Sequence, residues 1–86
     1  MSQWEKLLRK VLSGKSDANI PFDGLCGLLE RLGYHLDRIE GSHRIYIRPG
    51  QPEIVNLQPA KDGKAKDYQV KRVRQILVKY HQTQVR

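Results

Sequence analysis

The stretch that decides the fold is "LCGLLERLGYHLDRIEGSHRIY", residues 25–46. Its first half repeats leucine at helical spacing and ends at Gly33, a residue type that commonly closes a helix in the left-handed conformation. Its second half holds two short strand-like runs on either side of Gly41-Ser42, a pair with the turn chemistry of a hairpin. The stretch therefore predicts a helix followed directly by an antiparallel hairpin.

The same spacing rules extend this pattern to both ends of the chain. We expect helices over residues 2–13, 21–32 and 67–81, and strands over 34–40, 43–48 and 53–58. Ser2 and Glu5 fit a capping box at the start of the first helix, and Gly14 fits its end. The 86 residues argue for one domain, 1–86, with an extra N-terminal helix over 1–15 and a core over 20–81. The fold class is α+β, with a three-stranded antiparallel sheet packed against helices.

The second strand has two faces, and the assignment of its faces decides where a nearby histidine points. Ile45 and Ile47 share one face, which we expect to be the core face. His43 has the same parity as these two residues. Tyr46 belongs to the opposite face, where it could stack on the bases of single-stranded RNA.

Composition narrows the class of partner. The chain carries a formal charge of +7, which favours an anionic partner, either nucleic acid or an acidic protein. No apolar run is long enough to span a membrane and no signal peptide is visible, so we expect a cytoplasmic protein. The single cysteine, Cys26, excludes an internal disulfide and a Cys-rich metal site. The histidines lack partners at metal-ligand spacing, so neither a metal nor a cofactor is expected.

His43 is the residue with the clearest chemical potential. Histidine exchanges protons near neutral pH, as cleavage of RNA by its own 2′-hydroxyl requires. Gly41 lets a phosphate approach the backbone closely, and Ser42 could donate a hydrogen bond to a phosphate oxygen. A purely structural role for His43, as the first residue of a strand, stays open. Basic side chains that could hold the phosphate backbone are Arg44, Arg48, Lys64 and Lys66.

The quoted stretch also resembles the start of the HicA-type toxins of bacterial toxin–antitoxin pairs. Those proteins share a leucine-rich helix ending in Leu-Gly-aromatic, a strand, and Gly-Ser-His before a second strand. "EIVNLQ" (53–58) resembles their third strand, and "YQVKRVRQIL" (68–77) resembles their closing helix. The resemblance covers roughly residues 20 to 80, and the helix over 2–13 is an addition to the short family pattern.

The resemblance implies a fold similar to double-stranded-RNA-binding domains and a metal-independent mRNA-cleaving activity. It implies His43 as the catalytic residue, with Gly41 and Ser42 beside it, and a HicB-type antitoxin as partner. Two alternatives stay open: a non-catalytic RNA-binding module of similar fold, and a basic adaptor for an acidic protein.

Overall fold

The computed structural model describes residues 2–85 and folds them into three α-helices, one 3₁₀ turn and one three-stranded sheet. This arrangement confirms the predicted α+β class, similar to double-stranded-RNA-binding domains, and the predicted order of elements. The elements, in chain order, are α1 (Gln3–Ser13), η1 (Asp17–Asn19), α2 (Phe22–Arg31), β1 (His35–Glu40), β2 (His43–Arg48), β3 (Gln51–Leu57) and α3 (Asp67–Lys79).

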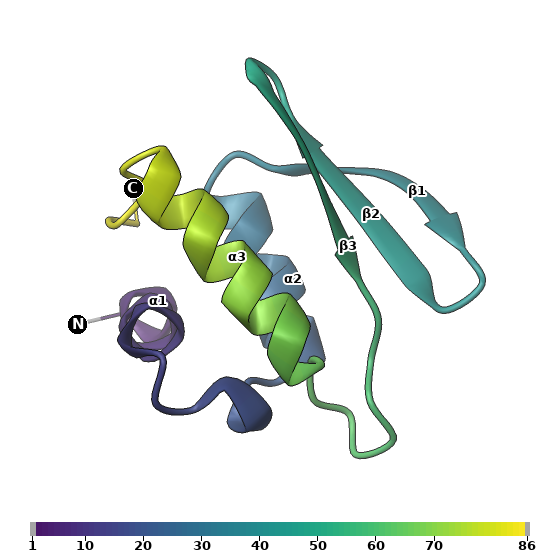
Figure 1. Cartoon of the computed structure of the whole chain (residues 1–86), viewed down its shortest axis with the longest axis horizontal. Coiled ribbons are helices and arrows are strands. Elements are labelled where there is room, and N and C mark those ends of the chain that lie inside the picture. The colour runs from purple at the N-terminus through teal and green to yellow at the C-terminus, as the bar shows by residue number, and fades with distance from the viewer. Residues whose placement is uncertain (1, 86) are drawn as a thin grey trace.

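The elements form three layers (Figure 1). The sheet lies on one side, α2 and α3 form the middle layer, and α1 packs against α2 and α3 on the side away from the sheet. The core between the layers is apolar and continuous, and it includes Leu28 and Leu29 of α2, Val73 and Leu77 of α3, and Tyr46 of β2. The α-β-β-β-α unit thus carries one additional helix on its outer side.

The sheet is antiparallel throughout, in the order β1-β2-β3. Tyr46 pairs with Val55, and both side chains are buried in the core cluster under the helices. The expectation that Tyr46 lies on the exposed face was therefore wrong, because the helices cover the face of β2 opposite to the one we had assigned. Ile45 is also buried, but it lies outside the core cluster, and Ile47 is exposed.

The predicted helix ends are confirmed at three positions. The Ser2 hydroxyl accepts a hydrogen bond from the Glu5 amide at 3.2 Å, as an N-cap does. Gly14 and Gly33 have φ angles of +71° and +92°, the left-handed conformation that favours glycine after a helix. The second hairpin turns at Pro49-Gly50, so β3 begins at Gln51, two residues earlier than expected.

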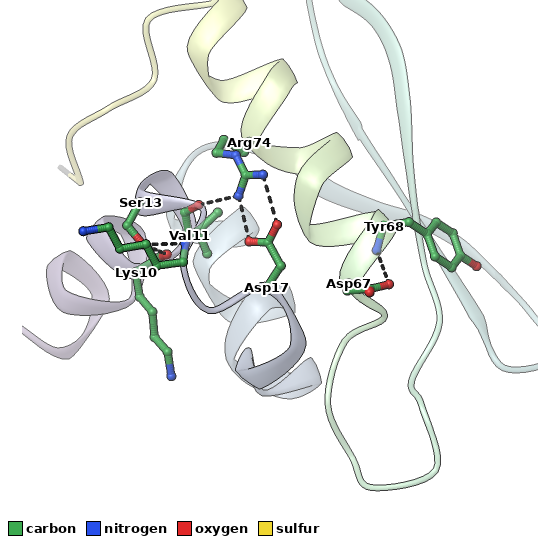
Figure 2. Close-up of polar contacts among 8 residues, drawn as sticks. Lys10, Val11, Ser13, Asp17, Asp67, Tyr68 and Arg74 are labelled. Atoms are coloured by element: carbon green, nitrogen blue, oxygen red, sulfur yellow. Dashed lines mark hydrogen bonds and ion pairs between the residues drawn. The ribbon is translucent and has the colours of Figure 1, made fainter.

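Arg74 ties the additional helix to the rest of the molecule (Figure 2). Its guanidinium donates to both carboxylate oxygens of Asp17, at 2.7 and 3.0 Å, and to the Val11 carbonyl at 3.0 Å. One side chain of α3 therefore holds both η1 and the end of α1. The Arg74 hydrogen bond also lowers the pKa of the Asp17 carboxyl.

Candidate active site

His43 begins β2 immediately after the tight turn at Gly41-Ser42. Gly41 has a φ of +60°, so it supplies the left-handed residue that this turn needs. His43 is half-buried, and it lies on the sheet face that the helices leave open, because Tyr46 occupies the covered face. The expectation that His43 lies on the core face of β2 was therefore wrong, because the helices cover the face that carries Tyr46.

Asn56 of β3 orients the imidazole ring. Its Oδ1 lies 2.9 Å from His43 Nδ1. An amide oxygen only accepts hydrogen bonds, so Nδ1 carries the proton and Nε2 keeps its lone pair. The same bond persists when the ring becomes an imidazolium, because Nδ1 is a donor in both states. The geometry therefore leaves Nε2 available to take up and release a proton.

His43 and Asn56 line a hollow of about 530 Å³ between β2, β3 and α3. Eight side chains form its walls, including two cations and no carboxylate. Tyr68 is 62 % exposed there, and Figure 2 shows its ring projecting outward from the first turn of α3. A histidine, two cations and an exposed aromatic ring suit a ligand that combines phosphate with bases. The lining residues are His43, Ile54, Asn56, Tyr68, Gln69, Lys71, Arg72 and Gln75.

A hydrogen-bond chain links the hairpin turn to the start of α3. Lys66 Nζ donates to Gln58 Oε1 at 2.9 Å, and Gln58 Nε2 donates to Ser42 Oγ at 3.1 Å. The backbone N–H of Gln58 donates to Gln69 Oε1 at 2.8 Å, and Gln69 is buried. Two of the predicted residues, Ser42 and Lys66, are thus joined through Gln58 on the side of the molecule that holds His43.

Three other predicted residues lie on the helix-covered face. The Arg44 guanidinium lies 5.3 Å from the centroid of the Phe22 ring, and Arg48 Nε donates to the Leu32 carbonyl at 3.1 Å. Tyr46 is 1 % exposed, and its burial raises the pKa of its hydroxyl. The predicted stacking of Tyr46 on a base is incompatible with this burial. Because β2 side chains alternate between faces, His43 is separated from all three.

Lys64 is also outside the hollow. Its Nζ donates to Asn19 Oδ1 at 3.0 Å, and the Lys64 backbone forms an isolated antiparallel β-bridge with Pro21 at the start of α2. This cation stabilises the loop between β3 and α3 against the segment before α2.

Only His43 among the eight lining residues was a predicted site residue; the other seven are Ile54, Asn56, Tyr68, Gln69, Lys71, Arg72 and Gln75. With Tyr68, the last three follow the spacing 68, 71, 72, 75, which places them on one face of α3. That polar stripe is visible in the sequence. Its position beside His43 is not, because it depends on how α3 packs along β3.

A family model described as "HicA toxin of bacterial toxin-antitoxin" matches residues 23–82 of the 86. The chain belongs to the HicA toxin family. Comparisons with curated proteins and with solved structures gave no match. The HicA match begins in α2 and ends after α3, so it includes every lining residue of the hollow and leaves α1 outside.

Membership assigns this HicA chain to the toxins of bacterial toxin–antitoxin systems. No helix within residues 2–85 is long and apolar enough to cross a membrane.

Proposed function

We propose that this HicA-family chain is an endoribonuclease that cleaves mRNA without a metal, with His43 as the proton-transferring residue. The observation that carries the proposal is the free Nε2 of His43, oriented by Asn56, in a hollow that contains Lys71, Arg72 and an exposed Tyr68. Positive charge and a stacking surface account for RNA binding, and the oriented imidazole accounts for chemistry.

The proposed step is attack by the RNA's own 2′-hydroxyl. His43 Nε2 accepts the proton of that hydroxyl while its oxygen forms a bond to phosphorus. The bond from phosphorus to the 5′-oxygen breaks, and the departing oxygen takes a proton from solvent. Lys71 and Arg72 stabilise the extra negative charge that develops on the phosphate oxygens, and Tyr68 stacks on a neighbouring base.

We also propose that the partner is a HicB-type antitoxin that neutralises the chain by covering the hollow, and that both act in the cytoplasm. A cationic hollow without a carboxylate is complementary to an acidic protein surface, as it is to RNA. Antitoxin and RNA would therefore compete for Lys71 and Arg72.

The test compares wild type with His43→Ala, using purified protein and a labelled RNA. General acid–base catalysis contributes about 10²- to 10⁴-fold, so we expect His43→Ala to lose cleavage on that scale. His35→Ala is the matched control, because His35 is exposed on β1 and outside the hollow. Circular dichroism of each variant checks that the fold is intact. Equal cleavage by wild type and His43→Ala would remove the catalytic role.

The non-catalytic alternative has its own outcome in the same assay. A wild-type protein that binds RNA, loses that binding with rising salt, and never cleaves it would be an RNA-binding module. Lys71→Ala together with Arg72→Ala should weaken binding and lower the salt dependence by about two phosphate contacts. Lys6→Ala together with Arg9→Ala removes the same charge from exposed positions on α1, and should leave binding nearly unchanged.

A further inference from the structure

The outer edge of β1 is an open sheet edge with exposed apolar side chains. β1 is an edge strand in the order β1-β2-β3, and all six of its residues are exposed. Leu36 and Ile39, its two large apolar side chains, are 42 % and 58 % exposed. An edge strand with exposed apolar side chains offers backbone groups and apolar surface to another strand.

A register shift in β1 places these two apolar side chains on one face. Leu36 pairs with Tyr46, but the pairing slips by one residue at Asp37, and Ile39 then pairs with Arg44. Because Tyr46 and Arg44 share a face of β2, Leu36 and Ile39 also share it. By the same register His35, Arg38 and Glu40 lie on the other face, opposite Ile47, Ile45 and His43. Regular alternation would have put Leu36 and Ile39 on opposite faces.

With this slip, the sequence His-Leu-Asp-Arg-Ile-Glu becomes complementary to itself. Laid antiparallel against a second copy, His35 meets Glu40, Leu36 meets Ile39 and Asp37 meets Arg38, and symmetry makes each pair occur twice. A two-fold axis perpendicular to the sheet keeps every side chain on its own face, so paired residues must share a face. The slip satisfies this condition for the His35–Glu40 and Leu36–Ile39 pairs. The contact of 2.6 Å between the Asp37 carboxylate and the Arg38 guanidinium shows that these two side chains also reach the same side of the strand.

We propose that a second copy of this chain pairs antiparallel along β1, which joins the two sheets into one six-stranded sheet. Self-complementarity in charge and in apolar side chains selects a second copy over an unrelated partner. Within one chain Arg38 already contacts Asp37 at 2.6 Å and Glu40 at 2.7 Å. These pairs are exposed to solvent, so their exchange for equivalent pairs across the axis costs little. A single strand edge is a small interface, so the dimer is weak and depends on concentration.

The arrangement keeps the candidate active site accessible. None of the residues that line the hollow belongs to β1. The axis perpendicular to the sheet places the two His43 hollows on the same side of the joined sheet. One RNA strand could then contact both hollows, which would raise its apparent affinity.

The test measures mass against protein concentration by sedimentation equilibrium. We expect the weight-average mass of wild type to rise from 10.0 kDa towards twice that value as the concentration approaches about millimolar, as suits an interface this small. Ile39→Lys should keep the chain monomeric over this range. Val78→Lys is the matched control, because Val78 is 55 % exposed on α3, and it should dimerise like wild type.

A charge exchange tests the register itself. Arg38→Asp sets two carboxylates opposite each other at two places, so it should weaken the dimer about three- to thirty-fold. Asp37→Arg alone should weaken it similarly, and the two changes together should restore it to within about two-fold, because the pairs are then only reversed.

Three outcomes would overturn the proposal. The first is a wild-type protein that stays at 10.0 kDa at every concentration. If Ile39→Lys also abolished antitoxin binding in that case, the β1 edge would bind the antitoxin and not a second copy. The second is a dimer that Ile39→Lys leaves intact. The third is a double charge exchange that stays as weak as the single changes, which would reject the register.

Discussion

At the scale of the residue, the orientation of His43 matters most for the proposed activity. The imidazole lies on the open face of the sheet, and its Nδ1 forms a hydrogen bond of 2.9 Å with Asn56 Oδ1. Neutral histidine has two tautomers, and only the one with a proton on Nδ1 presents a basic Nε2 to the hollow. Asn56 therefore acts as a positioning residue, because it selects the tautomer without touching the reacting phosphate.

We predict that Asn56→Ala loses this selection. Wild type should show His43 protonated on Nδ1 in long-range ¹H–¹⁵N spectra, and Asn56→Ala should shift the ring towards the Nε2-protonated form. RNA cleavage should fall about ten-fold or more, because the wrong tautomer removes the base nitrogen. Asn56→Asp should keep the tautomer and move the acid limb of the pH–rate profile to higher pH, since a carboxylate stabilises the imidazolium.

Asn19→Ala is the control for this prediction, because the Asn19 amide bonds Lys64 and lies outside the hollow. A wild-type ring protonated on Nε2 would contradict the positioning role whether or not the protein cleaves RNA.

At the scale of the element, α2 is shaped by the helix that packs against it. Gly24 and Gly27 lower the intrinsic helix propensity of α2, so its stability depends on packing against its neighbours. The contact at Gly27 shows why glycine stands there. A Cβ at Gly27 would lie 2.5 Å from Trp4 Cη2, closer than van der Waals contact allows, so α1 can approach α2 only over a glycine. The guanidinium of Arg31, one helical turn after Gly27, lies over the Trp4 ring at 5.4 Å from the ring centroid.

We predict that Gly27→Ala destabilises the protein and loosens α1. The gain in helix propensity is about 1 kcal/mol, and overpacking of a rigid ring costs about 1–3 kcal/mol, so a net loss of about 1 kcal/mol is expected. The emission of Trp4, the single tryptophan of the chain, should shift to the red as its ring is displaced into water. Urea unfolding and fluorescence measure both effects.

Gly24→Ala is the matched control on the same helix. A Cβ there would lie 3.3 Å from Leu7 Cδ2, the tip of a flexible side chain that can move aside. The propensity gain should then dominate and leave the protein equally or more stable. Destabilisation of both variants to the same degree would contradict the role assigned to Trp4.

At the scale of the whole molecule, two ion pairs join distant segments within a strongly basic chain. Asp17 pairs with Arg74, which connects η1 to α3, and Glu53 pairs with Lys79, which connects β3 to the end of α3. The Arg74 hydrogen bond lowers the pKa of Asp17. Hydrogen bonds from Lys79 and then Tyr80 lower the pKa of Glu53 to about 2. Both carboxyls thus bind protons more weakly in the folded chain than in the unfolded one.

We predict that the folded chain loses stability in acid. Unfolded carboxyls titrate near pH 4, so the contribution of these pairs is complete above about pH 5 and is lost as the pH falls towards about 2. Protonation also raises the net charge above +7, and self-repulsion adds to the loss. Urea unfolding from pH 7 to pH 2 measures the effect.

Asp17→Asn and Glu53→Gln should each lower stability at pH 7 and flatten the acid-dependent loss. Glu30→Gln is the control, since Glu30 is an exposed carboxylate on α2 outside both pairs. An acid-dependent loss that both variants leave unchanged would show that other groups control it.

The sequence by itself determined the order of elements, because that order follows from local hydrophobic spacing. It also determined the helix ends at Gly14 and Gly33 and the turn at Gly41-Ser42, because glycine favours these left-handed positions. The family followed from the same local patterns. The sequence also selected His43 as the candidate catalytic residue. Only the tertiary structure decided which face of β2 is covered, because β2 carries large side chains on both faces and pairing with Val55 selects Tyr46 for the core. That pairing turns His43 outward to Asn56 and to the polar stripe of α3, a juxtaposition of residues distant in sequence that no local pattern specifies.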